Sequence, residues 1–299
     1  PAFGMILFAI SMCVNTFLNF VLIFGHFGAP AMGVTGAAVA TFASRVVEFA
    51  VAVGFALWNK RLPLRPACIL RPGRDILRSF LKYSTPVVCN ETLWSMGTSM
   101  LTVIMGHMAN SQDMLAAYAL IGNIDKLSTV VCFGIAAASA VIIGKEIGMG
   151  RDRERVYSVG WTLLVVSLLV GALVMLLLLA LLPLFFRPVL FRLFKLTAGA
   201  AEVAGYLAVV YAVFMPMRAF DVTNITGVLR AGGDVKMAAF IDNGPLWLAS
   251  IPLMALAGLV LNAPTWLVCI AMQAENLCKC PLGLIRFRSG KWINDITRI

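Results

Sequence analysis

Charged residues are scarce in this 299-residue sequence: only 13% of its residues are Asp, Glu, Lys or Arg, whereas 61% are hydrophobic. A soluble domain of this length has no interior large enough to hide so much apolar surface, so the composition excludes a soluble globular protein. Histidine is nearly absent, with two residues. The seven cysteines form no Cys-x-x-Cys pair and lie away from both histidines, so we expect neither a metal centre nor a disulfide framework.

Long apolar stretches fill most of the chain instead. A helix that crosses a membrane needs about 20 mostly apolar residues. Strict alternation of apolar and polar residues, the pattern of a membrane β-barrel, is absent. The sequence therefore predicts an all-α, polytopic transmembrane bundle of about eight spans. The candidate spans are residues 1–24, 34–58, 84–107, 114–144, 156–185, 199–229, 236–260 and 265–285.

The net charge of +10 is distributed unevenly along the chain. Basic residues gather in every second loop, at 59–82, 145–155 and 230–236, and around the C-terminus, where Lys279 is counted with them. Because basic residues near span ends mark the cytoplasmic side, these loops and the C-terminus are predicted to be cytoplasmic. The basic residues do not form an aromatic-basic patch of the kind that binds nucleic acid, so we expect no nucleic-acid partner.

Three carboxylates lie well inside predicted spans: Glu91, Asp125 and Asp221. A helical rise of about 1.5 Å per residue places each of them roughly 13–18 Å from an end of its span, near the middle of the bilayer. Ionisable groups are costly in hydrocarbon and usually serve an ion or substrate pathway. We therefore predict that these three carboxylates couple a cation, either as a proton site or as an oxygen cage for sodium.

Structural roles are open for the same carboxylates. Arg218 precedes Asp221 by three residues on one helical face and is predicted to neutralise it. Lys126 projects about 100° away from Asp125 and is expected to pair with a charge on another helix. Two further carboxylates are interpreted as structural, because they lie nearer the cytoplasmic ends of their spans: Asp242 and Glu275.

A substrate cavity needs polar and aromatic side chains on the same spans as the acids. Residues of this kind are the predicted lining of the cavity: Asn90, Trp94, Tyr118, Asn123 and Asn224. Prolines inside the spans are expected to bend them, as in helices that line transport paths: Pro86, Pro216, Pro245 and Pro252.

Several short motifs together resemble the multidrug and toxic compound extrusion (MATE) transporters of bacteria. The motifs are NFVLIFG at 19–25, GVTGAAVAT at 33–41, YSTP at 83–86, NETLW at 90–94, GKEIG at 144–148, GVLRAGGD at 227–234, Asp242, Leu246-Trp247, and RFRSGKWIN at 286–294. The resemblance implies a protein of twelve helices in two six-helix lobes, of which this chain lacks the N-terminal helices. It further implies that Glu91 is the seventh-helix carboxylate, and Asp221 the tenth-helix carboxylate, that some members use for cation coupling.

The resemblance implies the following organisation: residues 1–58 complete the N-terminal lobe, 59–83 link the lobes at the cytoplasmic surface, 84–288 form the C-terminal lobe, and 289–299 form a cytoplasmic tail. The expected function is efflux of amphipathic, cationic, drug-like compounds in exchange for H⁺ or Na⁺, with no other cofactor. We expect a monomer in the bacterial cytoplasmic membrane, in contact with the lipid bilayer and with small-molecule substrates.

Three alternatives remain open. A flippase for lipid-linked oligosaccharides, from the same superfamily, would need several cavity-facing cations, for which only Arg45, Lys126 and Arg218 qualify. A membrane enzyme would need a clustered nucleophile or metal ligands, and neither HExxH nor GxSxG occurs. The third alternative is a membrane protein without transport activity. Arg45 is interpreted as a structural partner of Glu48, three residues further on.

Overall fold

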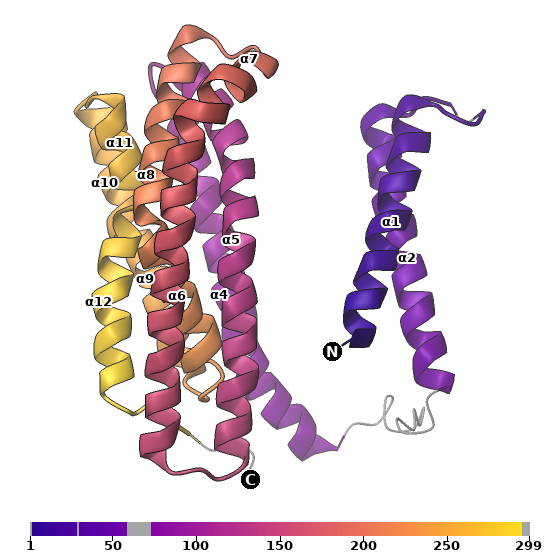
Figure 1. Cartoon of the computed structure of the whole chain (residues 1–299), viewed down its shortest axis with the longest axis vertical. Coiled ribbons are helices and arrows are strands. Elements are labelled where there is room, and N and C mark those ends of the chain that lie inside the picture. Colours follow the sequence, from indigo (N-terminus) through magenta and orange to yellow (C-terminus); the bar gives the residue numbers. More distant parts are fainter. Residues whose placement is uncertain (1, 29, 59–72, 295–299) are drawn as a thin grey trace. The chain divides into compact units, whose positions relative to one another are not determined.

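A computed structural model describes residues 2–28, 30–58 and 73–294 of the chain. The fold divides into two compact units, Pro1–Ser79 and Phe80–Ile299, which are described separately. Every element in the described ranges is a helix (Figure 1). Most of the predicted inter-lobe linker, residues 59–72, lies outside the described residues.

The first unit contains a pair of helices, α1 (Ala2–Phe24) and α2 (Gly33–Trp58). They pack closely because Gly36 has no side chain: a Cβ there would lie 2.6 Å from the Leu22 carbonyl oxygen. The predicted pair of Arg45 and Glu48 is confirmed, with 2.6 Å between Nη1 and Oε2, and Ser11 donates a hydrogen bond to the same Glu48 oxygen.

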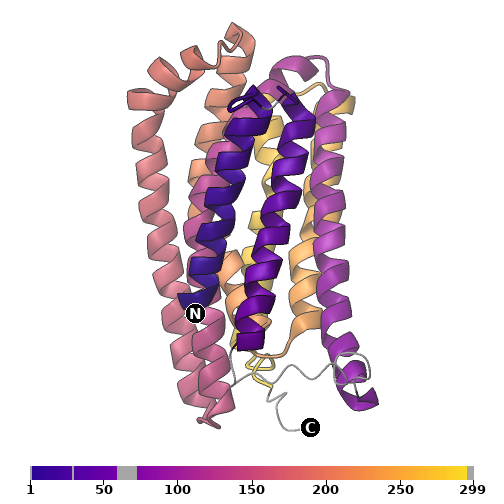
Figure 2. The same cartoon turned by 90° about the vertical axis from the view of Figure 1, so that its right-hand side faces the viewer.

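The second unit is a bundle of long helices with shorter segments between them. Its elements are α4 (Arg74–Gly106, which begins just before the boundary), α5 (Ser111–Gly148), α6 (Arg153–Leu181), η1 (Leu182–Leu190), α7 (Phe191–Leu193), α8 (Ala198–Val222), η2 (Thr223–Leu229), α9 (Val235–Pro245), η3 (Leu246–Ser250), α10 (Ile251–Ala255), η4 (Leu256–Val260), α11 (Thr265–Met272) and α12 (Ala274–Arg288). Figure 1 and Figure 2 show α5, α6 and α8 running lengthwise through this bundle.

Six of the eight predicted spans are long and apolar enough to cross a membrane. The remaining two, 84–107 and 265–285, are helical but more polar than expected. The first belongs to α4, whose helix already starts at Arg74. The second is divided at Gln273, where α11 ends and α12 begins with acidic and basic residues. Polar residues lower the hydropathy of both segments, and some of them, such as Asn90 and Lys279, are buried against other helices.

Proline and π-helical turns coincide in the predicted span 236–260. Pro245 is the last residue of α9, directly before η3, and Pro252 is at the start of α10, directly after η3. A π-helical turn widens the helix and often marks a functional position. Both prolines therefore lie at a boundary between an α-helical and a π-helical segment, whereas Pro86 lies inside the continuous helix α4. The expected bends stay a prediction.

Helix α8 and its continuation η2 form the centre of the second unit. They contact α5, α6, α9 and α12. In the most apolar part of Ala198–Leu229, half of the residues are buried. In the most apolar part of Arg153–Leu193, only 17% of the residues are buried, so this segment lies at the periphery. Small residues permit these contacts: a Cβ on Gly227 would lie 2.8 Å from the Ala136 carbonyl oxygen. Polar residues on α8 and η2 are therefore enclosed by other helices.

The end of the described chain folds back onto the bundle. Trp292 is fully buried and stacks on Phe287, with 5.4 Å between ring centroids. The backbone N–H of Asn294 donates to the Gly232 carbonyl oxygen at 2.9 Å, and the Arg286 guanidinium pairs with the Asp234 carboxylate. The segment predicted as a polar tail is thus packed at least as far as Asn294.

Close packing between α6 and α8 gives a stability prediction. A Cβ on Gly171 would lie 2.7 Å from the Ala219 Cβ and 2.8 Å from the Pro216 Cα, so the helices must move apart to accept it. We expect Gly171→Ala to lower the free energy of unfolding by about 1–3 kcal/mol, the usual range for overpacking. Thermal unfolding of the purified protein in detergent measures this. Gly134→Ala, on α5 with open space around it, is the control; equal melting of both variants would contradict the prediction.

Candidate ion-coupling site

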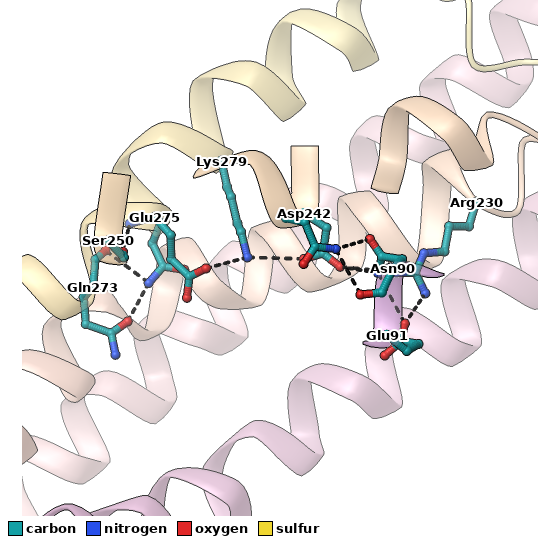
Figure 3. Close-up of polar contacts among 10 residues, drawn as sticks. Asn90, Glu91, Arg230, Asp242, Ser250, Gln273, Glu275 and Lys279 are labelled. Atoms are coloured by element: carbon teal, nitrogen blue, oxygen red, sulfur yellow. Dashed lines mark hydrogen bonds and ion pairs between the residues drawn. The ribbon is translucent and has the colours of Figure 1, made fainter. Parts of the chain in front are cut away.

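A charged network joins α4, α9 and the turn after η2. Arg230, which caps η2, contacts two carboxylates: its Nη1 lies 3.0 Å from Glu91 Oε1, and its Nη2 lies 3.3 Å from Asp242 Oδ2 (Figure 3). The Glu91 side chain is 58% exposed, whereas those of Arg230 and Asp242 are largely covered. Arg230 was counted above as a loop charge that marks the cytoplasmic side, but its guanidinium is bound inside the unit.

The network continues to α12 through Lys279, as Figure 3 shows. Its ammonium lies 3.2 Å from Asp242 Oδ1 and 2.9 Å from Glu275 Oε2, and its side chain is only 7% exposed. Assigning Lys279 to the basic residues around the C-terminus was therefore wrong. It is a buried cation between Asp242 and Glu275, the two acids that the sequence analysis interpreted as structural.

Amide side chains fix the α4 end of this network. Asn90 is buried and donates to Asp242 Oδ2 at 2.9 Å. Asn243 donates in turn to Asn90 Oδ1 at 2.6 Å and to the Asn90 carbonyl oxygen at 3.1 Å. Asn90, predicted as a substrate-cavity residue, thus orients a carboxylate and ties α4 to α9.

Asp221 is the most enclosed of the predicted coupling acids. It lies on α8, is 4% exposed, and neither of its carboxylate oxygens has a hydrogen-bond partner among the described residues. Lys279, Glu275 and Asp242 are the charges that act on it most strongly. Since a buried ionised carboxylate without a donor is costly, this site is suited to take up a cation or a proton.

Buried polar groups adjoin Asp221 in the chain. Thr223 and Asn224, at the start of η2, are fully buried, and their side-chain polar atoms likewise have no hydrogen-bond partner within the described ranges. Asn224 faces α12, because a Cβ on Gly283 would lie 2.7 Å from its Nδ2. Native proteins rarely leave several buried polar groups unpaired, so this segment has unused ligand capacity.

Asp125 occupies a different environment. Both of its oxygens contact the Arg218 guanidinium, and the pair Nη2–Oδ2 is 3.0 Å apart. Arg218 also lies over the Tyr211 ring, 5.6 Å from its centroid. The prediction that Arg218 neutralises Asp221 was therefore wrong. Lys126, expected to pair with another helix, is exposed.

The remaining predicted cavity residues do not converge on one place. Trp94 and Asn123 are exposed, and Asn123 donates only to the Ala119 carbonyl of its own helix. Tyr118 is half-buried against the apolar core of the unit. A cavity of about 360 Å³ lies at α7 and the start of α8, and none of the five predicted residues lines it. Their assignment to a substrate site stays a prediction.

A bound metal ion would need several of these acidic side chains to lie close together. Within the part of the chain that the structure describes, no group of three or more His, Cys, Asp or Glu residues is arranged to hold a metal ion. Asp242 and Glu275 each have Lys279 as a counter-ion instead.

Comparison with known proteins identifies the fold. The MatE family model matches residues 86–256, more than half of the chain. The chain belongs to the MATE family. Members of this family are transporters and not enzymes, and the apolar helices agree with a multi-pass membrane protein. The family suggested by the sequence motifs is thus confirmed.

Two curated bacterial proteins illustrate the relationship. The chain is 28% identical over 292 residues to a probable multidrug resistance protein NorM of Thermotoga maritima, covering 96% of this chain and 60% of the relative. It is 27% identical over 277 residues to the uncharacterized transporter YisQ of Bacillus subtilis, covering 92% and 58%. The chain therefore spans about 60% of the length of these relatives.

Solved structures share the fold at low sequence identity. A multidrug resistance MATE family transporter of the MOP superfamily in its outward-facing conformation superposes with a TM-score of 0.79 at 18% identity, covering 96% of this chain and 62% of the other. An inward-facing conformation gives a TM-score of 0.70 at 18% identity, covering 96% and 64%. The membrane-helical architecture predicted from the sequence is confirmed.

Proposed function

We propose that this chain carries the ion-coupling half of a secondary multidrug antiporter, which exports amphipathic cationic compounds in exchange for H⁺ or Na⁺. The observation that carries the proposal is Asp221, a carboxyl group enclosed at the centre of the second unit without a hydrogen-bond partner among the described residues. Relatives named multidrug resistance proteins support the substrate class. We place the protein in the bacterial cytoplasmic membrane with its C-terminus in the cytoplasm.

Cation uptake at Asp221 would change the relative stability of two conformations. An ionised Asp221 is costly in a closed, dry site and less costly in a state that admits water, so neutralisation favours closure. Coupling requires that the ion and the drug have different affinities for the two states. The π-helical turns η2 and η3 lie next to the acids and provide irregular backbone of the kind that transporters place at such sites.

Glu91 has a different place in this scheme. Its exposed carboxylate, paired with Arg230, is accessible, while Asp221 is enclosed. We infer that a cation meets Glu91 first and displaces the Arg230 guanidinium, which remains bound to Asp242. Displacement costs less than breaking a fully buried pair, because Glu91 is exposed to solvent and Arg230 keeps its contact with Asp242.

Gradient-driven efflux tests the proposed function. Right-side-out membrane vesicles containing the complete protein are loaded with a fluorescent cationic dye, and dye efflux is followed under an imposed inward H⁺ or Na⁺ gradient. We expect one of the two gradients to drive transport and its specific ionophore to stop it. Well-folded protein that moves dye under neither gradient would contradict the proposal.

We expect Glu91→Gln to lower the initial rate of gradient-driven efflux about tenfold, because the ion loses its first anionic contact, worth about 1.4 kcal/mol of barrier. Glu154→Gln, an exposed glutamate at the start of α6, is the matched control and should leave the rate unchanged. Equal rates for the two variants would remove Glu91 from the pathway.

Two cations that a flippase would need for phosphate binding are already paired. Arg218 is bound by Asp125, and Arg45 by Glu48. The third, Lys126, is exposed. These pairings favour drug export over transfer of a lipid-linked oligosaccharide.

A further inference from the structure

A basic cavity lies at the end of the second unit opposite the α5–α6 connection, near the label α7 in Figure 1. It has a volume of about 360 Å³, within the range of ligand-binding pockets. Its lining comes from η1, α7, the following turn and the first turns of α8. The lining residues are Arg187, Phe191, Arg192, Lys195, Leu196, Ala201 and Glu202.

The charge of this cavity is unbalanced. Arg187, Arg192 and Lys195 are exposed, and none of them forms an ion pair within the described ranges. Glu202, the one acid in the lining, accepts a hydrogen bond from the Tyr206 hydroxyl at 2.8 Å. Three cations against one carboxylate leave a site that attracts an anion, and the two guanidinium groups match the geometry of phosphate oxygens.

The Arg187 guanidinium lies against helix α8. A Cβ built on Gly205 of α8 would lie 3.3 Å from Arg187 Nη2, so the absence of a side chain there makes room for the guanidinium. The connection between α6 and α8 thus holds its arginine against the bundle.

The same segment exposes large apolar side chains beside its cations. These are Leu184, Phe185, Val189, Leu193 and Phe194, of which Leu184 is 75% exposed. A small soluble anion would make no contact with these apolar side chains, whereas the acyl chains of a lipid would pack against them. Cations next to exposed apolar groups at a helix end are the arrangement by which membrane proteins hold anionic headgroups.

We propose that this cavity, formed by η1, α7 and the start of α8, binds the phosphate headgroup of an anionic phospholipid. The basic segments near Arg151, Lys236 and Lys291 lie at the other end of the unit, where Arg153 donates to the Ile293 carbonyl and Arg286 pairs with Asp234. With those segments predicted to be cytoplasmic, the bound lipid belongs to the outer leaflet. This site is independent of the proposed transport mechanism.

Native mass spectrometry of the complete protein in detergent, titrated with phosphatidylglycerol, tests the proposal. We expect Arg187→Gln/Arg192→Gln to weaken binding about tenfold or more, because two charge-assisted contacts are lost. Arg151→Gln/Lys236→Gln removes the same charge elsewhere and should bind as the parent does. Equal lipid binding by both double variants would overturn the site.

Two further measurements separate the alternatives. Glycerol phosphate and inorganic phosphate probe the headgroup chemistry alone; binding of either as tightly as the lipid would overturn the assignment to a phospholipid.

Discussion

Asp221→Asn is expected to reduce gradient-driven dye efflux to the level of vesicles without the transporter, while the protein remains as stable as the parent. Neither Asp221 oxygen has a hydrogen-bond partner among the described residues, so the amide breaks no contact of the resting structure. It does remove the charge that would bind the ion. The isosteric substitution therefore separates coupling from folding, and it is measured by efflux and by thermal unfolding in detergent.

Asp125→Asn is the matched control for this prediction. Asp125 binds the Arg218 guanidinium through both oxygens, and its loss leaves a largely buried cation without its partner. We expect that variant to unfold more easily by about 3 kcal/mol or more, the cost of breaking a buried pair. Normal efflux in Asp221→Asn would contradict the coupling role, as would a stability loss as large as that of Asp125→Asn.

The contrast between these two acids shows what the sequence could predict. Its apolar stretches indicated a helical membrane bundle, and its motifs indicated the MATE family, because both signals are local in sequence. The same signals placed Asp125 and Asp221 inside spans. Which acid meets Arg218 depends on the rotation of one helix against another. Spacing along α8 favoured Asp221, but α5 supplies Asp125 to the same guanidinium.

Lys279 and Arg230 show a second limit. Arg230 was assigned to a cytoplasmic loop and Lys279 to the basic residues around the C-terminus, and each is bound by a carboxylate from another helix. One signal for Lys279 was present in the sequence: Glu275 precedes it by four residues, the spacing of an ion pair on one helical face. No comparable local pattern links Asp242 to Lys279, because that contact joins α9 to α12.

Fragmented helices were the least predictable part of the fold. Prolines at 245 and 252 indicated bends, but the π-helical turn between them changes which side chains face the core. A periodicity of 3.6 residues cannot follow such a change. The roles of Asp242 and Asn243 beside α4 became visible only with the structure.

Lys279→Met is expected to be strongly destabilising. The lysine is 7% exposed and neutralises Asp242 and Glu275, so its removal leaves two carboxylates inside the unit without their cation. Breaking a buried ion pair from one side typically costs about 3–5 kcal/mol. We expect a loss of this size in thermal unfolding in detergent. Lys236→Met, an exposed lysine at the start of α9, should melt like the parent.

Part of the stability should return when the acids are neutralised together with the lysine. Removing the acids with the lysine removes the cost of leaving two buried carboxylates without their cation. We therefore expect Lys279→Met/Asp242→Asn/Glu275→Gln to recover part of the stability lost in Lys279→Met, with Arg230 keeping Glu91 as its partner. A stable Lys279→Met, or a triple variant no more stable than the single one, would show that Lys279 does not hold these acids.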